Sequence, residues 1–367
     1  MIIAIIDIGS GSIGLALVVL EKDKVPTLKF SLRREMRFQN TLAPEMLLSQ
    51  TLKILSSIII DMQKKLPDAP SGVFCFLSPH LIASQTRTIK INFTEPTAID
   101  ESVINNVVGK EIEKFKTEAL IEQKIMSVKL NGYEVSNLNK IAAEAEISVF
   151  FTLTSEKILD NIKDTISASF HNRQIEFHSF PFAYFSVLRD IFKIDSDFVC
   201  MDIGSEITDI SLIKGGILER STSFPFGKNE ITRSLIDKTS VDRSLAGSMI
   251  KNYTEGIVEQ GIRSELGKEI STAGSRWLDA AKSAIRQISA EGKLPGKFFI
   301  LADKDVSSVF NNIIGSISLV DKVILNKEPE IIELTGADLN KFYNSNGSST
   351  YDPFLTMEAI FVNKLLN

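Results

Sequence analysis

The sequence predicts an α/β protein made of two related α/β halves, with a small α+β lobe inserted into the first half. The main observation is a repeated phrase: "IIDIGSGSIG" begins at Ile5 and "MDIGSEITDI" begins at Met201. Each copy is an apolar run, then Asp-Ile-Gly-Ser, then a second apolar run. A second observation is a change near residue 85, where fully apolar strands give way to alternating strands and charged helices.

Length and composition limit the classes of protein that fit. A chain of 367 residues is long for a single core, so we expect at least two domains. A net charge of −5 argues against binding to a nucleic-acid backbone, which requires a basic face. Cys75 and Cys200 lie in apolar runs and are expected to be buried thiols in a reducing compartment. The start of the chain lacks the pattern of a signal peptide and no apolar run is long enough for a membrane span, so we expect a cytoplasmic protein.

The first half reads as three strands, a helix and a fourth strand. Apolar runs predict strands over 2–8, 13–20, 28–38 and 72–77, and the apolar spacing over 43–65 predicts an amphipathic helix. The third strand carries Arg33, Arg34 and Arg37. We expect these arginines to form a solvated strand edge, with an acidic partner as the alternative. The histidines His80, His171 and His178 lie in separate segments, and we expect ordinary loop or surface positions for them.

The lobe is expected over residues 85–169. Its signals are an alternating strand, a charged helix over 99–121, a hairpin turned by Asn131-Gly132, a further strand and a helix over 156–169. A helix over 180–192 follows the lobe, and the second copy of the phrase then opens the second half.

The rest of the second half predicts strands at 207–213, 217–225 and 322–325, a helical stretch over 229–290, and a strand and helix beginning at Lys297. A final helix near 354–366 is expected to pack in the core. The resulting division is a first core domain of 1–84 and 170–195, the lobe, a second core domain of 196–228 and 295–367, and an outer helical subdomain of 229–294.

The repeated hairpin has the chemistry of a phosphate site. Gly9 and Gly11 carry no side chains, so backbone N–H groups there can approach a phosphate closely. Ser10 and Ser12 add hydroxyl donors, and Asp7 at the end of the strand can hold a hydrated Mg²⁺.

The pair of hairpins resembles the two phosphate-binding elements of the actin-like ATPase fold, and within it the FtsA and PilM proteins of bacteria. The narrower match is carried by "LNGYEVSN" with "EISVFFTL", "FPFAYFSVL", "DIGSEITDISLIKGG" and "FPFGKNEITRSL". The resemblance implies a duplicated actin-like fold with two facing α/β domains. It also implies ATP held with Mg²⁺ by Asp7 and Asp202, and further nucleotide contacts that are listed here: Gly9, Ser10, Gly11, Ser12, Gly204, Ser205, Thr208 and Lys251. No catalytic residue is identified.

The sequence departs from that family pattern at three places. "ILADKD" (residues 300–305) stands where a Gly-Gly turn normally meets the adenosine, and Gly247 stands where a Glu is expected, with Lys251 one position late. Ser205-Glu206 replaces Gly-Gly in the second hairpin, which would bring a negative charge near the phosphates. We therefore expect weak Mg²⁺-dependent ATP binding, and hydrolysis that is weak or absent.

Three functions are compatible with these observations. The first is an FtsA-like adaptor or scaffold of the cell-division machinery, assembling through its lobe. The second is a PilM-like cytoplasmic component of type IV pilus assembly that binds a peptide of a membrane partner. The third is a small-molecule kinase on the same fold, for which the chain lacks an evident catalytic acid and a Gly-rich adenosine turn. The expected partners are proteins, with self-assembly possible, no nucleic acid, and the inner face of the membrane reached only through a partner.

Overall fold

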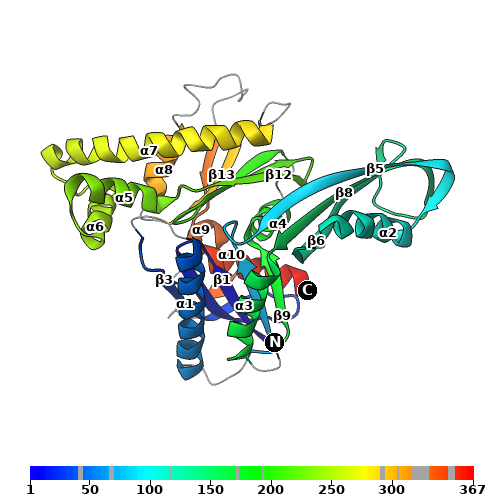
Figure 1. The fold of residues 1–367 in the computed structure, drawn as a ribbon, viewed down its shortest axis with the longest axis horizontal. Coiled ribbons are helices and arrows are strands. Elements are labelled where there is room, and N and C mark those ends of the chain that lie inside the picture. The colour runs from blue at the N-terminus through cyan, green and yellow to red at the C-terminus, as the bar shows by residue number, and fades with distance from the viewer. Residues whose placement is uncertain are drawn as a thin grey trace.

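The computed structural model describes residues 1–39, 44–65, 70–115, 117–170, 173–191, 194, 196–289, 294–303, 306–315, 330–345 and 352–367. It contains two larger sheets, one above the other in Figure 1, and a third sheet that extends to one side. The strand expected at 322–325 and the histidine His171 lie outside the described residues.

The first sheet has the strand order β15-β3-β2-β1-β4-β9. Its members are β1 (Ile2–Ile8), β2 (Ser12–Val19), β3 (Thr27–Glu35), β4 (Gly72–Leu77), β9 (Ile175–Ser179) and the short β15 (Asn344–Ser345). The strands β1, β2 and β3 pair in antiparallel fashion, while β4 and β9 continue the sheet in parallel. Helices α1 (Pro44–Lys65) and α3 (Glu156–Ser167) cover one face of this sheet.

The second sheet repeats that topology, which supports duplication of one unit. Its order is β12-β11-β10-β13-β14, from β10 (Phe198–Ile203), β11 (Thr208–Lys214), β12 (Ile217–Phe224), β13 (Lys297–Ala302) and β14 (Glu330–Glu333). Again three strands pair in antiparallel fashion and two follow in parallel. Its outer face packs against the long helix α7 (Gln260–Ser289), and α5 (Lys228–Thr239), α6 (Arg243–Thr254) and α8 (Ser307–Gly315) belong to the same hydrophobic cluster.

A shared hydrophobic cluster lies between the two sheets. Helices α4 (Phe180–Ile191) and α10 (Pro353–Leu366) pack against each other there, with the short α9 (Gly336–Leu339) beside them. Successive residues of β1 face opposite sides, so Ile3 and Ile5 join this shared cluster whereas Ala4 and Ile6 join the cluster under α1. Burial on both faces explains why β1 reads as a continuous apolar run.

The lobe is a four-stranded sheet of order β5-β8-β6-β7 with α2 (Glu101–Ile112) and the 3₁₀ turn Glu113–Phe115 on one face. Its strands are β5 (Ala83–Ile99), β6 (Ala119–Leu130), β7 (Tyr133–Glu134) and β8 (Lys140–Thr154), and it projects sideways in Figure 1. The helix expected over 99–121 is therefore shorter, because Ala119 already begins β6. The expected turn at Asn131-Gly132 is present, and both residues have positive φ.

Hydroxyl groups join the lobe to the second sheet. Within the lobe, the hydroxyl oxygens of Ser84 on β5 and Thr152 on β8 lie 2.9 Å apart. Those of Thr88 on β5 and Ser148 on β8 lie 3.1 Å apart. The Thr86 hydroxyl donates to the carbonyl oxygen of Leu218 on β12, and Ser221 donates to the carbonyl of Ser84 at 3.3 Å. The lobe thus contacts the second half through polar side chains, and Phe150 of β8 also enters the hydrophobic cluster that contains Leu218 of β12.

Two expected domain boundaries need correction. Helix α3 was expected in the lobe, but its buried Ile162 and Ile166 pack in the cluster of the first sheet. The C-terminal segment was expected in the second core domain, but β15 pairs with β3 and α10 contacts β1 and β2. Both predictions failed for the same reason: a helix can follow one domain in the sequence and still pack against the sheet of another.

One of the two described histidines differs from expectation. His178 is buried at the end of β9, stacked on Phe76 at 5.5 Å between ring centroids, so the loop or surface position expected for it is wrong. His80 follows β4; its Nδ1 lies 2.8 Å from the Ser78 hydroxyl and its Nε2 is buried. Burial lowers the pKa of His80 to about 4.

This lowered pKa predicts an acid-sensitive contribution to stability. Because neutral His80 is favoured in the folded chain, its contribution is complete above the unfolded pKa of about 6.5 and is lost as pH falls towards 4. We expect the wild type to lose about 2 kcal/mol more unfolding free energy than His80→Gln between pH 7 and pH 5. Urea denaturation of both proteins at the two pH values measures this difference, and equal losses would contradict it.

Candidate functional site

The two Asp-Ile-Gly-Ser turns have the same local geometry. The Gly9 N–H donates to the carbonyl of Ser12, and the Gly204 N–H donates to the carbonyl of Ile207, both at 3.0 Å. Each turn connects the first two strands of its sheet, and the aspartate before it lies near the end of the first strand. The hairpins are therefore equivalent parts of the two halves.

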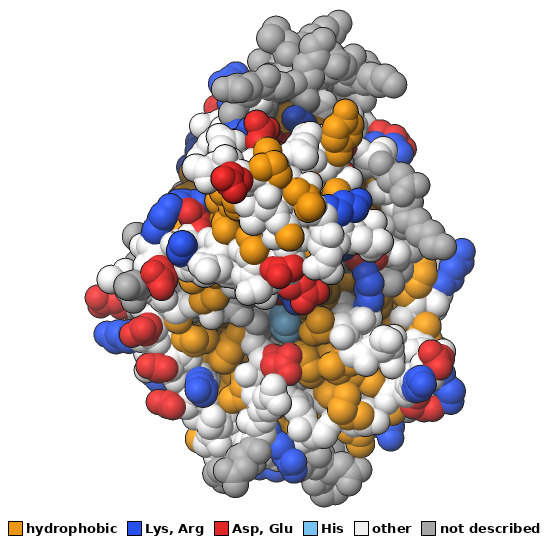
Figure 2. All heavy atoms as spheres, turned by 90° about the vertical axis from the view of Figure 1, so that its right-hand side faces the viewer, with side chains coloured by type: hydrophobic (Ala, Val, Ile, Leu, Met, Phe, Trp, Pro, Cys, Tyr) orange, Lys and Arg blue, Asp and Glu red, His pale blue; other side chains and the backbone are white. Residues whose placement is uncertain are grey.

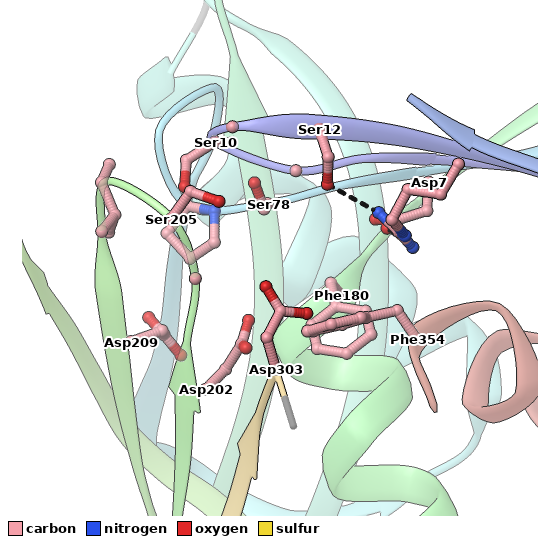
Figure 3. A pocket seen from close by; sticks show the side chains of 16 residues that line it. Asp7, Ser10, Ser12, Ser78, Phe180, Asp202, Ser205, Asp209, Asp303 and Phe354 are labelled. Atoms are coloured by element: carbon pink, nitrogen blue, oxygen red, sulfur yellow. Dashed lines mark hydrogen bonds and ion pairs between the residues drawn. The ribbon is translucent and has the colours of Figure 1, made fainter. Parts of the chain in front are cut away.

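The tips of the two hairpins touch. A Cβ built on Gly11 would lie only 2.2 Å from the Cβ of Ser205, so a side chain at position 11 has no room. The Ser10 hydroxyl accepts a hydrogen bond of 3.1 Å from the N–H of Glu206. Figure 3 shows Ser10 and Ser205 next to each other at this contact.

The cleft below the tips brings together most of the residues that the sequence nominated. It encloses about 40 Å³. The nominated residues that line it are Asp7, Gly9, Ser10, Gly11, Ser12, Asp202, Gly204 and Ser205. Asp7 and Asp202 thus face one cavity from opposite halves, as Figure 3 shows.

Thr208 and Lys251 are placed elsewhere. Thr208 is fully buried; its hydroxyl donates to the carbonyl of Phe226 at 2.7 Å and accepts the Trp277 indole N–H at 2.9 Å. Lys251 is exposed on α6, with Glu255 at 3.9 Å, and is not among the residues lining the cleft. Thr208 therefore anchors α7 to the second sheet.

The negative charge expected from Glu206 does not reach the cleft. Its carboxylate is buried, accepts a 2.6 Å hydrogen bond from the Asn229 amide and pairs with Arg233. These partners lie on α5, 23 and 27 residues further along the chain, so the sequence around the hairpin gave no sign of them.

Arg33 is the cleft residue that sequence reasoning misplaced. Its Nη2 lies 2.6 Å from Asp7 Oδ2, its Nε lies 2.6 Å from Asp352 Oδ2, and its Nη1 donates to the Ser12 hydroxyl at 2.9 Å. The alternative of an acidic partner was thus the correct one for this arginine. Its neighbour Arg34 points elsewhere and pairs with Asp61 on α1.

Burial controls the electrostatics of the cleft. Burial raises the pKa of Asp7, and the Arg33 guanidinium opposes that effect. Burial, together with the Asp209, Asp7 and Asp303 carboxylates, raises the pKa of Asp202 well above its usual range. Burial also raises the pKa of Asp209 to about 7. The cavity therefore has carboxyl groups on several sides and one guanidinium.

The enclosed part of the cleft is small, and larger hollows adjoin it. Since one water needs roughly 10–15 Å³ by this measure, the enclosed 40 Å³ holds only a few waters. In the described part of the chain, no three His, Cys, Asp or Glu side chains form a group that could hold a metal ion. The hollow of about 560 Å³ shares Ser12, Arg33, Ser205 and Asp303 with the cleft, and the hollow of about 450 Å³, which Gly247 also lines, shares Glu35 and Lys228 with the first hollow.

The role of Thr208 gives a stability prediction. Thr208→Val should lower the unfolding free energy by about 1–3 kcal/mol, because the buried Trp277 N–H would lose its acceptor. Thr222→Val is the matched control: this half-buried hydroxyl also lies on the β11–β12 hairpin, but its bond to Gln287 is exposed to solvent, and its removal should cost about 0.5 kcal/mol or less. Denaturant unfolding followed by Trp277 fluorescence measures both values, and equal values would contradict the buried role of Thr208.

No protein-family model matches the sequence, and no match to a curated protein was found. Among solved structures, the chain is similar to the "PilM-PilN type IV pilus biogenesis complex", with 13% identity, 98% of this chain and 96% of that chain covered, and a TM-score of 0.64. Two further structures match over 98% of this chain. One is the ethanolamine utilization protein EutJ from Carboxydothermus hydrogenoformans, with 11% identity, 89% of that chain covered and a TM-score of 0.47. The other is an actin-like ATPase-fold protein from Bacteroides thetaiotaomicron, with 9% identity, 95% of that chain covered and a TM-score of 0.43.

The likeness to PilM covers both sheets and the lobe, because it extends over nearly the whole of both chains. At this level of identity it establishes the fold. The topology agrees, with two equivalent sheets whose hairpins meet at one cleft. The chain therefore has the actin-like fold of the PilM and FtsA type.

Proposed function

We propose that this chain is a PilM-like adaptor of a pilus-type assembly machinery, which binds a short segment of a membrane protein. The observation that carries the proposal is the match, over nearly its whole length, to a PilM solved in complex with PilN. The sequence alone favoured a cell-division adaptor. Since no feature of the fold or cleft favours that role, we prefer the pilus-type alternative.

Two sheet edges support binding of an extended peptide. Within the described part of the chain, β9 has β4 as its strand partner and forms one edge of the first sheet. Strand β6 pairs with β7 only at Lys129 and Leu130, so among the described residues the stretch 119–128 has only β8 as a strand partner. An unpaired edge offers backbone N–H and C=O groups to which a peptide can add as a further strand.

The two edges are fixed relative to each other by a buried carboxylate. Glu122 on β6 lies 3.0 Å from His178 Nδ1 and accepts a 2.8 Å hydrogen bond from the Ser179 hydroxyl at the end of β9. Buried polar groups of this kind hold a defined geometry, because losing one partner leaves the others unsatisfied. The lobe and the first sheet therefore present their edges from one rigid corner.

Apolar side chains near this corner would supply binding energy. Leu120 and Ile125 on β6 are 39% and 44% exposed, which is high for large aliphatic side chains on a strand. Figure 2 looks onto this side of the molecule and shows hydrophobic side chains gathered on either side of its centre. A partner segment with alternating apolar residues would match such a surface.

A partner would also account for recruitment to the membrane. No helix in the described ranges combines the length and apolar character needed to cross a bilayer. The C-terminal helix α10 buries its residues 355–362 in the core, so this face is not offered to lipid. We propose a cytoplasmic location with recruitment through the partner, and no role for a catalytic step.

The test uses a synthetic extended peptide with alternating apolar residues, the chemistry that the exposed β6 edge would recognise. Ile125→Asp should weaken its binding at least tenfold in calorimetry, because a charge replaces an apolar contact at the β6 edge. Ile257→Asp is the matched control: Ile257 is 69% exposed but lies after α6, far from the corner in sequence and fold. It should leave the affinity unchanged.

Two outcomes would contradict the proposal. Equal affinity of the wild type and Ile125→Asp would place the peptide elsewhere. Absence of peptide binding, with self-association that Ile125→Asp abolishes in sedimentation velocity, would support the scaffold role that the sequence first suggested.

A further inference from the structure

A short segment of the first half lies against the helices of the second half. Residues 35–39 continue from β3, which ends at Glu35. Met36 anchors the start of this segment, because its side chain is buried in the cluster under α1 and its N–H donates to the carbonyl of Gly11 at 2.8 Å. The residues after Met36 therefore leave the first sheet beside the tip of the first hairpin.

Two arginines of the second half hold the ring of Phe38. The guanidinium carbon of Arg233 on α5 lies 5.5 Å from the ring centroid, and that of Arg243 at the start of α6 lies 5.2 Å from it. A cation over an aromatic face is attracted by the charge distribution of the ring. Arg233 Nε also donates to the Gln39 carbonyl at 3.1 Å, and Arg243 Nη2 lies 2.7 Å from an oxygen of Glu35. All of these contacts join one half of the chain to the other.

Arg233 also connects the segment to the second hairpin. Its guanidinium pairs with the buried carboxylate of Glu206, whose N–H donates to the Ser10 hydroxyl of the first hairpin at 3.1 Å. The two hairpin tips are thus joined directly through Ser10, and a second time through Arg233 and residues 35–39. Glu206 therefore serves to orient the arginine that receives this segment.

The segment begins where the two hollows beside the cleft meet. Glu35 and Lys228 line both the hollow of about 560 Å³ and the hollow of about 450 Å³. The Lys228 Nζ lies 3.9 Å from Glu35 and 2.6 Å from Asp303. Because both hollows share these side chains, their separation depends on where Glu35 is held.

We propose that residues 35–39 form a strap that fastens α5 and α6 to the first half and separates the two hollows. When the strap is released, Glu35 leaves Lys228 and Arg243, and the hollows join into one groove that reaches α6. The hollow beside the hairpins is open in either state. The inference goes beyond the proposed adaptor function and does not depend on it, since it uses none of the residues of the corner between β6 and β9.

The strap can be tested by measuring the distance between the first half and α6. Spin labels on Ile60→Cys of α1 and Lys251→Cys of α6 report this distance by pulsed electron resonance. Both side chains are exposed, and the native Cys75 and Cys200 are buried. We expect one narrow distance in the wild type, because the docked strap fixes α6 against the first half.

Two substitutions in the labelled protein release the strap. Arg243→Gln removes the ion pair with Glu35 and one cation over the ring, and Phe38→Ala removes the ring itself. Each should give a longer or broader distribution of distances. Arg233 is left in place, because its removal would leave Glu206 buried without its charged partner.

Arg263→Gln is the matched control. Its guanidinium carbon lies 5.2 Å from the Tyr253 ring, the same distance as between Arg243 and Phe38, but both of its residues belong to the second half. This variant should keep the narrow distance. The proposal is overturned if Arg243→Gln and Phe38→Ala both keep the wild-type distribution, or if Arg263→Gln broadens it as much as they do.

Discussion

One hydrophobic cluster sets the separation of the two sheets, and the geometry of the cleft depends on it. Alternate residues of β1 and β10, such as Ile5 and Cys200, enter this cluster from opposite sides, and α4 and α10 fill the space between them. Because interiors are packed at the density of a molecular crystal, the sheets cannot slide without losing many contacts. The hairpins at the ends of β1 and β10 are consequently held tip to tip.

The parts of the fold that sequence predicts well are those in which local pattern and tertiary packing agree. The apolar runs of β1 and β10 and the glycines of both turns are such signals. Arg33 could not be placed in this way. A predicted strand that carries three arginines suggests an edge exposed to solvent, and only the pairing of Arg33 with Gly14 on the neighbouring strand shows that its side chain has room to reach the cleft. Glu206 and Thr208 were misjudged for a similar reason: their partners Arg233 and Trp277 come from helices far along the chain. Side-chain partners across elements are set by packing that a one-dimensional pattern does not contain.

The cleft between the halves and the strand edges proposed for partner binding are separate sites on this fold. The cleft between the halves is lined by polar groups of both hairpins, whereas the edges of β6 and β9 belong to other parts of the two sheets. Function depends on the residues placed on a fold, so the two places can serve different purposes. The adaptor proposal needs only the rigid corner at Glu122 and the exposed strand edges.

The polar contact between the lobe and β12 has a mechanical consequence. Thr86 and Ser221 meet backbone carbonyls there, and hydroxyl groups can exchange one such acceptor for another by rotating a single bond. An apolar contact would resist sliding, because it exposes surface to water as soon as it shifts. The contact between the lobe and β12 combines these hydroxyl groups with Phe150 in the shared cluster, whereas the lobe is joined to the first sheet by the buried Glu122. Force on a partner bound at that corner would therefore reach the first half through Glu122, His178 and Ser179.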